Sequence, residues 1–218
     1  MKKYFKFALV LVMVLSLFVI TGCDKKTGNT KKEEKKDWAK ITYDFGKVTM
    51  TAEVPKDEEG NAKYEFTKDK PTTDVLMSRT GSVYLVTDDA IFAFGSTSWS
   101  YQTGQKYKEK YGEVKKGNFD DYMKWVKDKD SGIDLRGMEE LKINGRKAVR
   151  YYSFSGGSGS YKYYGYFYTI DVNEFYEGSR LDMNVYYNIP KSEVPTEAKE
   201  LSKETLEIIK TLKFKANE

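Results

Sequence analysis

Apolar and polar side chains alternate along residues 48–54, and this pattern constrains the fold more than any other feature of the sequence. The apolar positions, separated only by threonine and glutamate, are Val48, Met50, Ala52 and Val54. A period of two places such residues on one side of a half-buried β-strand. Residues 41–45 precede this segment across Gly46 and predict a strand that pairs with it. The chain is therefore expected to build its core on a sheet.

Other segments predict further strands and the turns between them. Residues 90–94 are almost all apolar, which is typical of a central strand. Asn144-Gly145 favours a two-residue hairpin turn, and the Gly- and Ser-rich residues 156–160 predict a flexible connection. The strands expected from these patterns are 83–86, 90–94, 141–143, 148–154, 161–170 and 181–187.

Helical spacing of apolar residues marks two segments. Asn118 suits a helix N-cap, and the apolar residues after it predict a helix over 118–129. Pro195 is predicted to open a C-terminal helix, whose apolar stripe comprises Ala198, Leu201, Ile208, Ile209 and Leu212. Because the connections between the strands are short, the predicted fold class is α+β, a mainly antiparallel sheet flanked by helices, including the C-terminal helix. Residues 96–116 predict no element.

The first 22 residues have the organisation of an export signal. Three lysines precede a 14-residue apolar run, residues 7–20, broken only by a serine. As an uncleaved helix this run would span about 21 Å, less than the roughly 30 Å of a hydrocarbon core. An ordinary secretory signal is the other alternative, but it would leave a free thiol exposed.

Ile20-Thr21-Gly22-Cys23 resembles the lipobox of bacterial lipoproteins. The resemblance implies that Cys23 carries a diacylglyceryl group and becomes the first residue of the mature protein. The protein is then expected at a bacterial cell membrane, held on the outer, extracytoplasmic side by its N-terminal lipid.

Residues 24–37 read DKKTGNTKKEEKKD and contain no apolar side chain. Such a segment predicts a solvated, flexible tether. The expected organisation is a signal peptide over 1–22, lipidated Cys23 and tether over 23–37, and a single domain over 38–218. Removal of the three signal lysines lowers the net charge from +4 to +1, so charge does not favour binding to nucleic acid.

The domain resembles the PsbP/Mog1-like family, known from thylakoid lumen proteins and from bacterial lipoproteins. The resemblance is carried by the strand pair before Pro55, by residues 141–148 (LKINGRKA) and by residues 208–214 (IIKTLKF). It implies an antiparallel sheet flanked by helices and a mostly non-enzymatic adaptor or assembly role. It supplies no catalytic motif that can be placed on this chain.

The sequence lacks histidine, and Cys23 is its one cysteine. These absences exclude Ser-His-Asp and Cys-His catalysis and the usual zinc ligand sets. No catalytic residue, metal site or cofactor is therefore predicted. Ser-Lys chemistry stays open, as does a pair of carboxylates facing each other across a cleft, as in a glycan hydrolase. The candidate carboxylates are Asp120, Asp121, Asp128, Asp130, Asp134, Glu139 and Glu140.

The segment from Asp128 to Glu139 has acidic residues at positions 1, 3, 7 and 12, as a calcium loop does. Such a loop needs glycine at position six, where this chain has Ile133. We therefore expect a solvated acidic turn after the helix.

The tyrosine-rich strand predicted over residues 161–170 is the strongest candidate for a binding surface. Strict alternation would place Tyr164, Tyr166 and Tyr168 on one face, with Tyr161, Tyr163 and Phe167 on the other. One face must meet the core; the other, if exposed, would offer a platform for sugar rings or an apolar patch for a protein. Core packing with ordinary surface tyrosines is the favoured expectation. The candidate surface comprises Tyr151, Tyr161, Tyr163, Tyr164, Tyr166 and Tyr168.

The expected location on the outer side of the cell membrane and the missing catalytic residues favour a non-catalytic binding or assembly module. Its expected partner is a protein or a cell-envelope glycan. A carboxylate-type envelope glycan hydrolase is one alternative. A solute-binding lipoprotein is another, although 181 residues from 38 to 218 are few for a two-lobed clamp.

Overall fold

The computed structural model describes residues 37–46, 48–69, 71, 83–98, 119–128, 134–157, 160–172 and 179–217. They belong to one compact unit, Asp37–Glu218. The signal sequence, Cys23 and most of the predicted tether lie outside the described residues, so the expected organisation of the N-terminus stays a prediction. No helix in the described ranges is long and apolar enough to cross a membrane.

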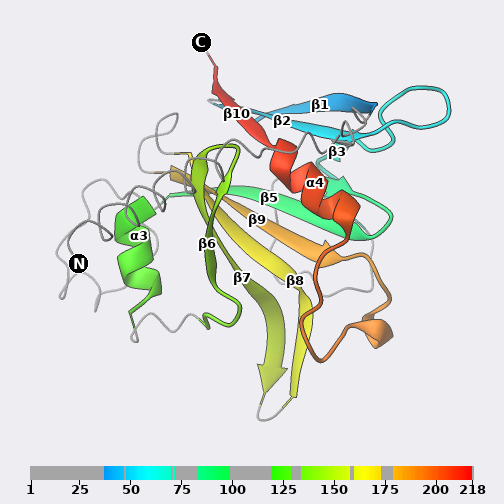
Figure 1. Ribbon diagram of the computed structural model, residues 1–218. Helices are drawn as coiled ribbons and strands as arrows, with labels where there is room; N and C mark the ends of the chain where they lie inside the picture. Colours follow the sequence, from blue (N-terminus) through cyan, green and yellow to red (C-terminus); the bar gives the residue numbers. More distant parts are fainter. Residues whose placement is uncertain are drawn as a thin grey trace, which may run out of the picture. The chain divides into compact units, whose positions relative to one another are not determined.

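Seven strands form the larger sheet, in which every neighbouring pair is antiparallel (Figure 1). Their order is β3 (Phe66–Thr67), β4 (Val83–Val86), β5 (Ala90–Ser98), β9 (Ser179–Tyr187), β8 (Ser160–Asp171), β7 (Arg146–Gly157) and β6 (Glu139–Ile143). The predicted strands are confirmed, and β5 is central because it lies between β4 and β9. The Asn144-Gly145 turn is also confirmed, with φ angles of 49° and 84°, the left-handed values that this turn requires.

The smaller sheet has the order β1 (Trp38–Asp44), β2 (Val48–Pro55) and β10 (Lys213–Ala216). The alternation predicted for β2 is confirmed, since its buried residues are Val48, Met50, Ala52 and Val54. No pattern predicted β10, a four-residue strand in which only Phe214 is buried.

Two α-helices occur in the described residues. The helix predicted over 118–129 is confirmed as α3 (Phe119–Val126), although Asn118 lies outside the described residues. The prediction that Pro195 opens the C-terminal helix is wrong, because α4 spans Lys203–Thr211 after a short 3₁₀ turn, η3 (Lys191–Glu193), and a non-helical segment. The physical start signal is Ser202, whose Oγ accepts a hydrogen bond from the Thr205 backbone N–H at 3.1 Å.

The main core lies on one face of the larger sheet, which we call the inner face. Apolar residues of β5, β8 and β9 there pack with the buried side of β2 and with α4, as with Phe92, Met50 and Ile208. The opposite face carries two smaller clusters. One joins α3 to Val149 of β7; the other comprises Tyr84, Ile91, Ala93, Tyr164, Tyr186 and Val194.

The predicted α+β fold class is therefore wrong, because the described chain is a β-rich fold of two antiparallel sheets. The helices are short, eight residues for α3 and nine for α4. Much of the layer on the inner face is the second sheet, since β2 buries its alternating residues there. The resemblance to the PsbP/Mog1-like family stays a prediction.

Candidate functional site

A bulge in β8 decides which tyrosines share a face. Along the β7–β8 ladder Ser153 pairs with Gly165, but the next residue of β7, Phe154, pairs with Tyr163. Tyr164 is therefore an extra residue in β8. Gly165 has a φ of 142°, and a Cβ there would lie 1.8 Å from the carbonyl oxygen of Val185. The bulge thus depends on glycine at this position.

The bulge overturns the predicted division of the tyrosines between the two faces. Tyr161 and Tyr163 share the inner face with Tyr166 and Tyr168, as their ring contacts with β7 show. Tyr164 instead packs with Tyr84 and Tyr186 on the opposite face. Strict alternation fails here because one extra residue reverses the side to which every later side chain points. Tyr151, the remaining candidate, lies on the opposite face beside Phe167 and the α3 cluster.

Six aromatic rings form a continuous series on the inner face, here called the aromatic row. Its members, in spatial order, are Tyr168, Tyr166, Tyr152, Tyr163, Phe154 and Tyr161. Successive ring centroids lie 6.5, 5.4, 5.4, 6.0 and 5.4 Å apart. The first two rings are buried, the next three are half-buried, and Tyr161 is 40% exposed. The row therefore leads from the core to the surface.

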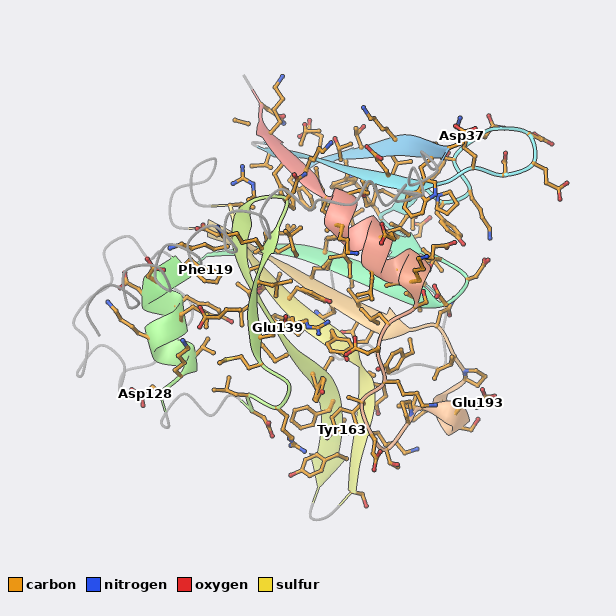
Figure 2. All side chains as sticks on the ribbon, in the orientation of Figure 1. Asp37, Phe119, Asp128, Glu139, Tyr163 and Glu193 are labelled. Atoms are coloured by element: carbon orange, nitrogen blue, oxygen red, sulfur yellow. The ribbon has the colours of Figure 1, made fainter. Side chains whose placement is uncertain are left out.

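The exposed part of the row lies where the β7–β8 hairpin extends past β9. The last β8–β9 pair is Gly165 with Tyr186, so residues of β8 before Gly165 have no β9 partner. Figure 1 shows β7 and β8 continuing beyond the end of β9, and Figure 2 places Tyr163 in this region. The backbone N–H of Tyr163 donates instead to the carbonyl of Pro195 at 2.9 Å. Tyr161 is thus presented on a supported hairpin rather than on a free loop.

Arg136 packs against the exposed end of the row. Its guanidinium carbon lies 4.2 Å from the ring centroid of Phe154 and 3.5 Å from that of Tyr161, within the range of cation–π contact. Its backbone carbonyl accepts a hydrogen bond from the Tyr152 N–H at 3.0 Å. Gly137 follows with a φ of 63°, and a Cβ there would meet the Tyr152 ring at 2.4 Å. We call Phe154, Tyr161, Tyr163 and Arg136 the row end.

Asp134 holds the guanidinium of Arg136 in place. Nε of Arg136 donates to both carboxylate oxygens, at 2.9 and 3.0 Å, and Nη2 donates to one of them. These hydrogen bonds lower the pKa of Asp134 below its ordinary value. The same contact, with smaller contributions from Tyr163 and Tyr161, raises the pKa of Arg136. The row end and Asp134 together therefore carry no net charge at neutral pH.

Five of the predicted acidic residues each form an ion pair with a different basic side chain. Asp134 pairs with Arg136, and Glu139 pairs with Arg150 at 2.8 Å. The other pairs are Asp120 with Lys147, Asp121 with Lys124 and Glu140 with Lys127. Asp130 lies outside the described residues. Within the described part of the chain, no three Cys, His, Asp or Glu side chains lie together so that they could hold a metal ion.

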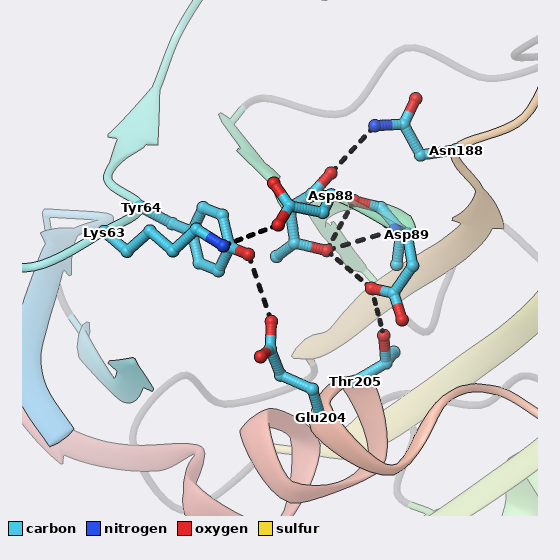
Figure 3. Close-up of polar contacts among 9 residues, drawn as sticks. Lys63, Tyr64, Asp88, Asp89, Asn188, Glu204 and Thr205 are labelled. Carbon is cyan, nitrogen blue, oxygen red and sulfur yellow. Dashed lines mark hydrogen bonds and ion pairs between the residues drawn. The ribbon is translucent and has the colours of Figure 1, made fainter. Parts of the chain in front are cut away.

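A second polar cluster joins the turn between β4 and β5 to α4 (Figure 3). Lys63 pairs with Asp88 at 2.5 Å, and the Tyr64 hydroxyl donates to Glu204 at 3.1 Å. Asp89 accepts a hydrogen bond from the Thr205 hydroxyl at 3.1 Å. Lys63 lowers the pKa of Asp88, and burial raises the pKa of Tyr64. These groups bind one another across residues 63–64, the β4–β5 turn and α4. We therefore infer that the cluster has a structural role and holds this turn against α4.

The sequence contained a signal for part of the row end. An isolated glycine within a strand pattern indicates a bulge, so Gly165 could have corrected the face assignment and placed Tyr161 and Tyr163 beside Phe154. Gly156, Gly157 and Ser160, predicted to form a flexible connection, belong to the paired ends of β7 and β8; residues 158–159 lie outside the described residues. No sequence pattern marked Arg136 as a site residue, because its contacts depend on how the turn that carries it lies against the β7–β8 hairpin.

Comparisons with known proteins identify no family for this chain. No family model matches the sequence, and no curated protein is detectably similar to it. A crystal structure of a protein from Bacteroides thetaiotaomicron VPI-5482 aligns with a TM-score of 0.38 and 13% sequence identity over 79% of this chain. The alignment covers 49% of that protein, so this chain spans about half its length.

Acid is expected to release the contact between Asp134 and Arg136. Because the pKa of Asp134 is lowered in the folded state, its stabilising effect is present above the unfolded pKa of about 3.9 and is lost as pH falls through the lower folded value. Asp134→Asn should lower the free energy of unfolding by roughly 0.2–1 kcal/mol at pH 7, the range for exposed ion pairs. Urea unfolding at pH 7 and pH 3 measures this difference, which should shrink at the lower pH.

Asp69→Asn is the matched control, since Asp69 is exposed and its carboxylate has no hydrogen-bond partner among the described residues. A difference between Asp134→Asn and wild type that stays equal at both pH values would contradict the assigned charge contact.

Proposed function

We propose that this chain is a lipid-anchored binding module on the outer side of a bacterial cell membrane, and that the row end is its binding surface. The N-terminal signal and Cys23 support the anchoring. The observation that carries the binding surface is the ring of Tyr161, which is exposed and yet fixed between an arginine and a second ring.

A fixed, exposed aromatic ring suits binding because it offers contact area without first losing conformational freedom. Tyr161 also pairs with Gly156, where a Cβ would lie 2.5 Å from the tyrosine ring. The edge of the ring that carries Cδ1 and Cε1 therefore lies close to the backbone of β7. The surface is therefore preorganised for binding.

The arrangement of the carboxylates favours binding over hydrolysis. A general acid and base must act on the substrate from positions facing each other, whereas Asp134, Glu139 and Glu140 each bind a different basic side chain. Each of these ion pairs would have to open before its carboxylate could take part in proton transfer. No observation on the described residues favours the hydrolase or the solute-binding alternative.

Photo-crosslinking in intact cells tests the proposal. The full-length protein carries a photoreactive phenylalanine analogue at position 161 or, as a control, at Lys142, an exposed residue of the edge strand β6. Crosslinks to an envelope component are expected from position 161 and not from position 142. Cys23→Ser should release the protein from the membrane fraction. Equal labelling from both positions would contradict the surface, and membrane retention of Cys23→Ser would contradict the anchor.

A further inference from the structure

We infer that the row end binds an uncharged glycan, with a sugar ring stacked on the face of the exposed Tyr161 ring opposite the Arg136 guanidinium. The inference rests on the proposed function and specifies the ligand class of the same surface. It follows from three properties of the row end: the extent of its exposed apolar surface, the pairing of its charges and the hydroxyl groups at its border.

The exposed apolar surface of the row end is limited to one exposed ring and two half-buried ones, which is less than a stable protein interface needs. Among the described residues, Tyr161 is the one large apolar side chain that is exposed; Phe154 and Tyr163 beside it are half-buried. A stable protein interface buries about 800 Å² on each partner, and aromatic anchors with large buried areas dominate its energy. A single fixed ring with two half-covered neighbours instead suits a ligand that presents one flat apolar face.

The charges of the row end are already paired, which disfavours an anionic ligand. Arg136 donates three hydrogen bonds to Asp134 through Nε and Nη2. A phosphate, sulfate or carboxylate would have to displace this internal carboxylate to reach the same nitrogens. An uncharged ligand meets no such competition, and removing a paired charge from water costs less than removing a single one.

Hydroxyl groups at the row end match the border of a sugar ring. Tyr161 and Tyr163 each carry a phenolic hydroxyl that can donate and accept hydrogen bonds. The Arg136 guanidinium, which lies over one face of the Tyr161 ring, and the Asp134 carboxylate bonded to it add a donor group and an acceptor group next to these tyrosines. A pyranose has the complementary form, with apolar C–H groups on its face and hydroxyls around its edge.

Isothermal titration of the full-length protein in detergent tests this inference. The probes are two neutral β-1,4-linked tetrasaccharides, one of N-acetylglucosamine and one of glucose, and a sulfated oligosaccharide of similar length. At least one neutral probe should bind, with an affinity that changes little with salt. Tyr161→Ala should weaken that affinity about tenfold or more, the loss that corresponds to one stacking contact of about 1.4 kcal/mol.

Two further variants separate stacking from loss of folding. Tyr161→Trp keeps an aromatic ring and should retain binding, and Lys162→Ala changes the exposed neighbour in β8 and should bind as the wild type does. Thermal unfolding followed by circular dichroism should be the same for all of these proteins.

Three results would overturn the inference. These are unchanged affinity in Tyr161→Ala, salt-sensitive binding of only the sulfated probe, and no binding of either neutral probe at millimolar concentration. If the neutral probes fail while position 161 still crosslinks a protein in cells, the glycan inference fails and the proposed binding function stands. If position 161 also gives no crosslink, both fail.

Discussion

Replacing Gly165 with alanine should lower the free energy of unfolding by about 4 kcal/mol or more, or prevent folding. At a φ of 142° an L-amino acid is strained, at a cost of about 1–3 kcal/mol. The new Cβ would also lie 1.8 Å from the Val185 carbonyl oxygen. Since backbone atoms cannot move aside as a flexible side chain can, β8 and β9 would have to separate at Gly165, the last pair of their ladder in the larger sheet. Losses of this size are exceptional for single substitutions.

Gly95→Ala is the matched control for this effect. Gly95 lies in β5, and a Cβ there would meet no atom within 4 Å. The substitution should be neutral or stabilise by about 0.4–1 kcal/mol, because alanine restricts the unfolded chain. Urea unfolding of the two variants and the wild type, followed by circular dichroism, gives the comparison. Equal stability of Gly165→Ala and Gly95→Ala would mean that the bulge does not require glycine.

The same glycine explains why the strands were predictable and their faces were not. Periodicity identifies a strand from a few neighbouring residues, and it correctly placed 48–54, 90–94 and 181–187. The face on which a side chain lies depends on every residue between it and the core, so one inserted residue reverses the assignment. Tyr161 and Tyr164 exchanged faces for this reason.

The fold class was missed for a related reason. The apolar stripe of the C-terminal segment suggested a long helix from Pro195, but the Tyr187 hydroxyl donates to the carbonyl of Lys199 and accepts from its N–H, which holds that segment in a non-helical path. Lys213–Ala216 pairs with β2 although its alternation covers only four residues. Both features depend on contacts between segments far apart in the chain, which local periodicity does not record.

The candidate site was only partly accessible from the sequence. Tyr161 and Tyr163 were identified as members of a possible surface because aromatic residues cluster in one strand. Phe154 belonged to a predicted strand but was not connected with them, because the register of the β7–β8 pair was unknown. Arg136 stood in a segment interpreted as an acidic turn. Arg136 belongs to the row end because the turn that carries it places its guanidinium against Phe154 and Tyr161 of the β7–β8 hairpin.

Tyr166→Ala should lower the free energy of unfolding by about 3–5 kcal/mol, the range for removing a large buried ring. Tyr166 is 2% exposed, lies 5.4 Å from the Tyr152 ring centroid, and has the Arg150 guanidinium 5.0 Å above its ring. Loss of the ring would leave a cavity in the core and remove the inner support of the aromatic row. Tyr166→Phe keeps the ring and removes only the hydroxyl, so it should cost less than about 1.5 kcal/mol.

The comparison with Tyr161→Ala then tests whether the row connects the core to the surface. Since burial decreases along the row, the loss of stability should be largest at Tyr166, smaller at Tyr163 and within about 0.5 kcal/mol of zero at Tyr161. Glycan affinity should show the reverse order, with the largest loss at Tyr161. Chemical unfolding and calorimetric titration of the same three alanine variants measure both series. Equal destabilisation at the two ends would contradict the position of Tyr161 outside the core, and equal losses of affinity would show that binding follows overall stability rather than the exposed ring.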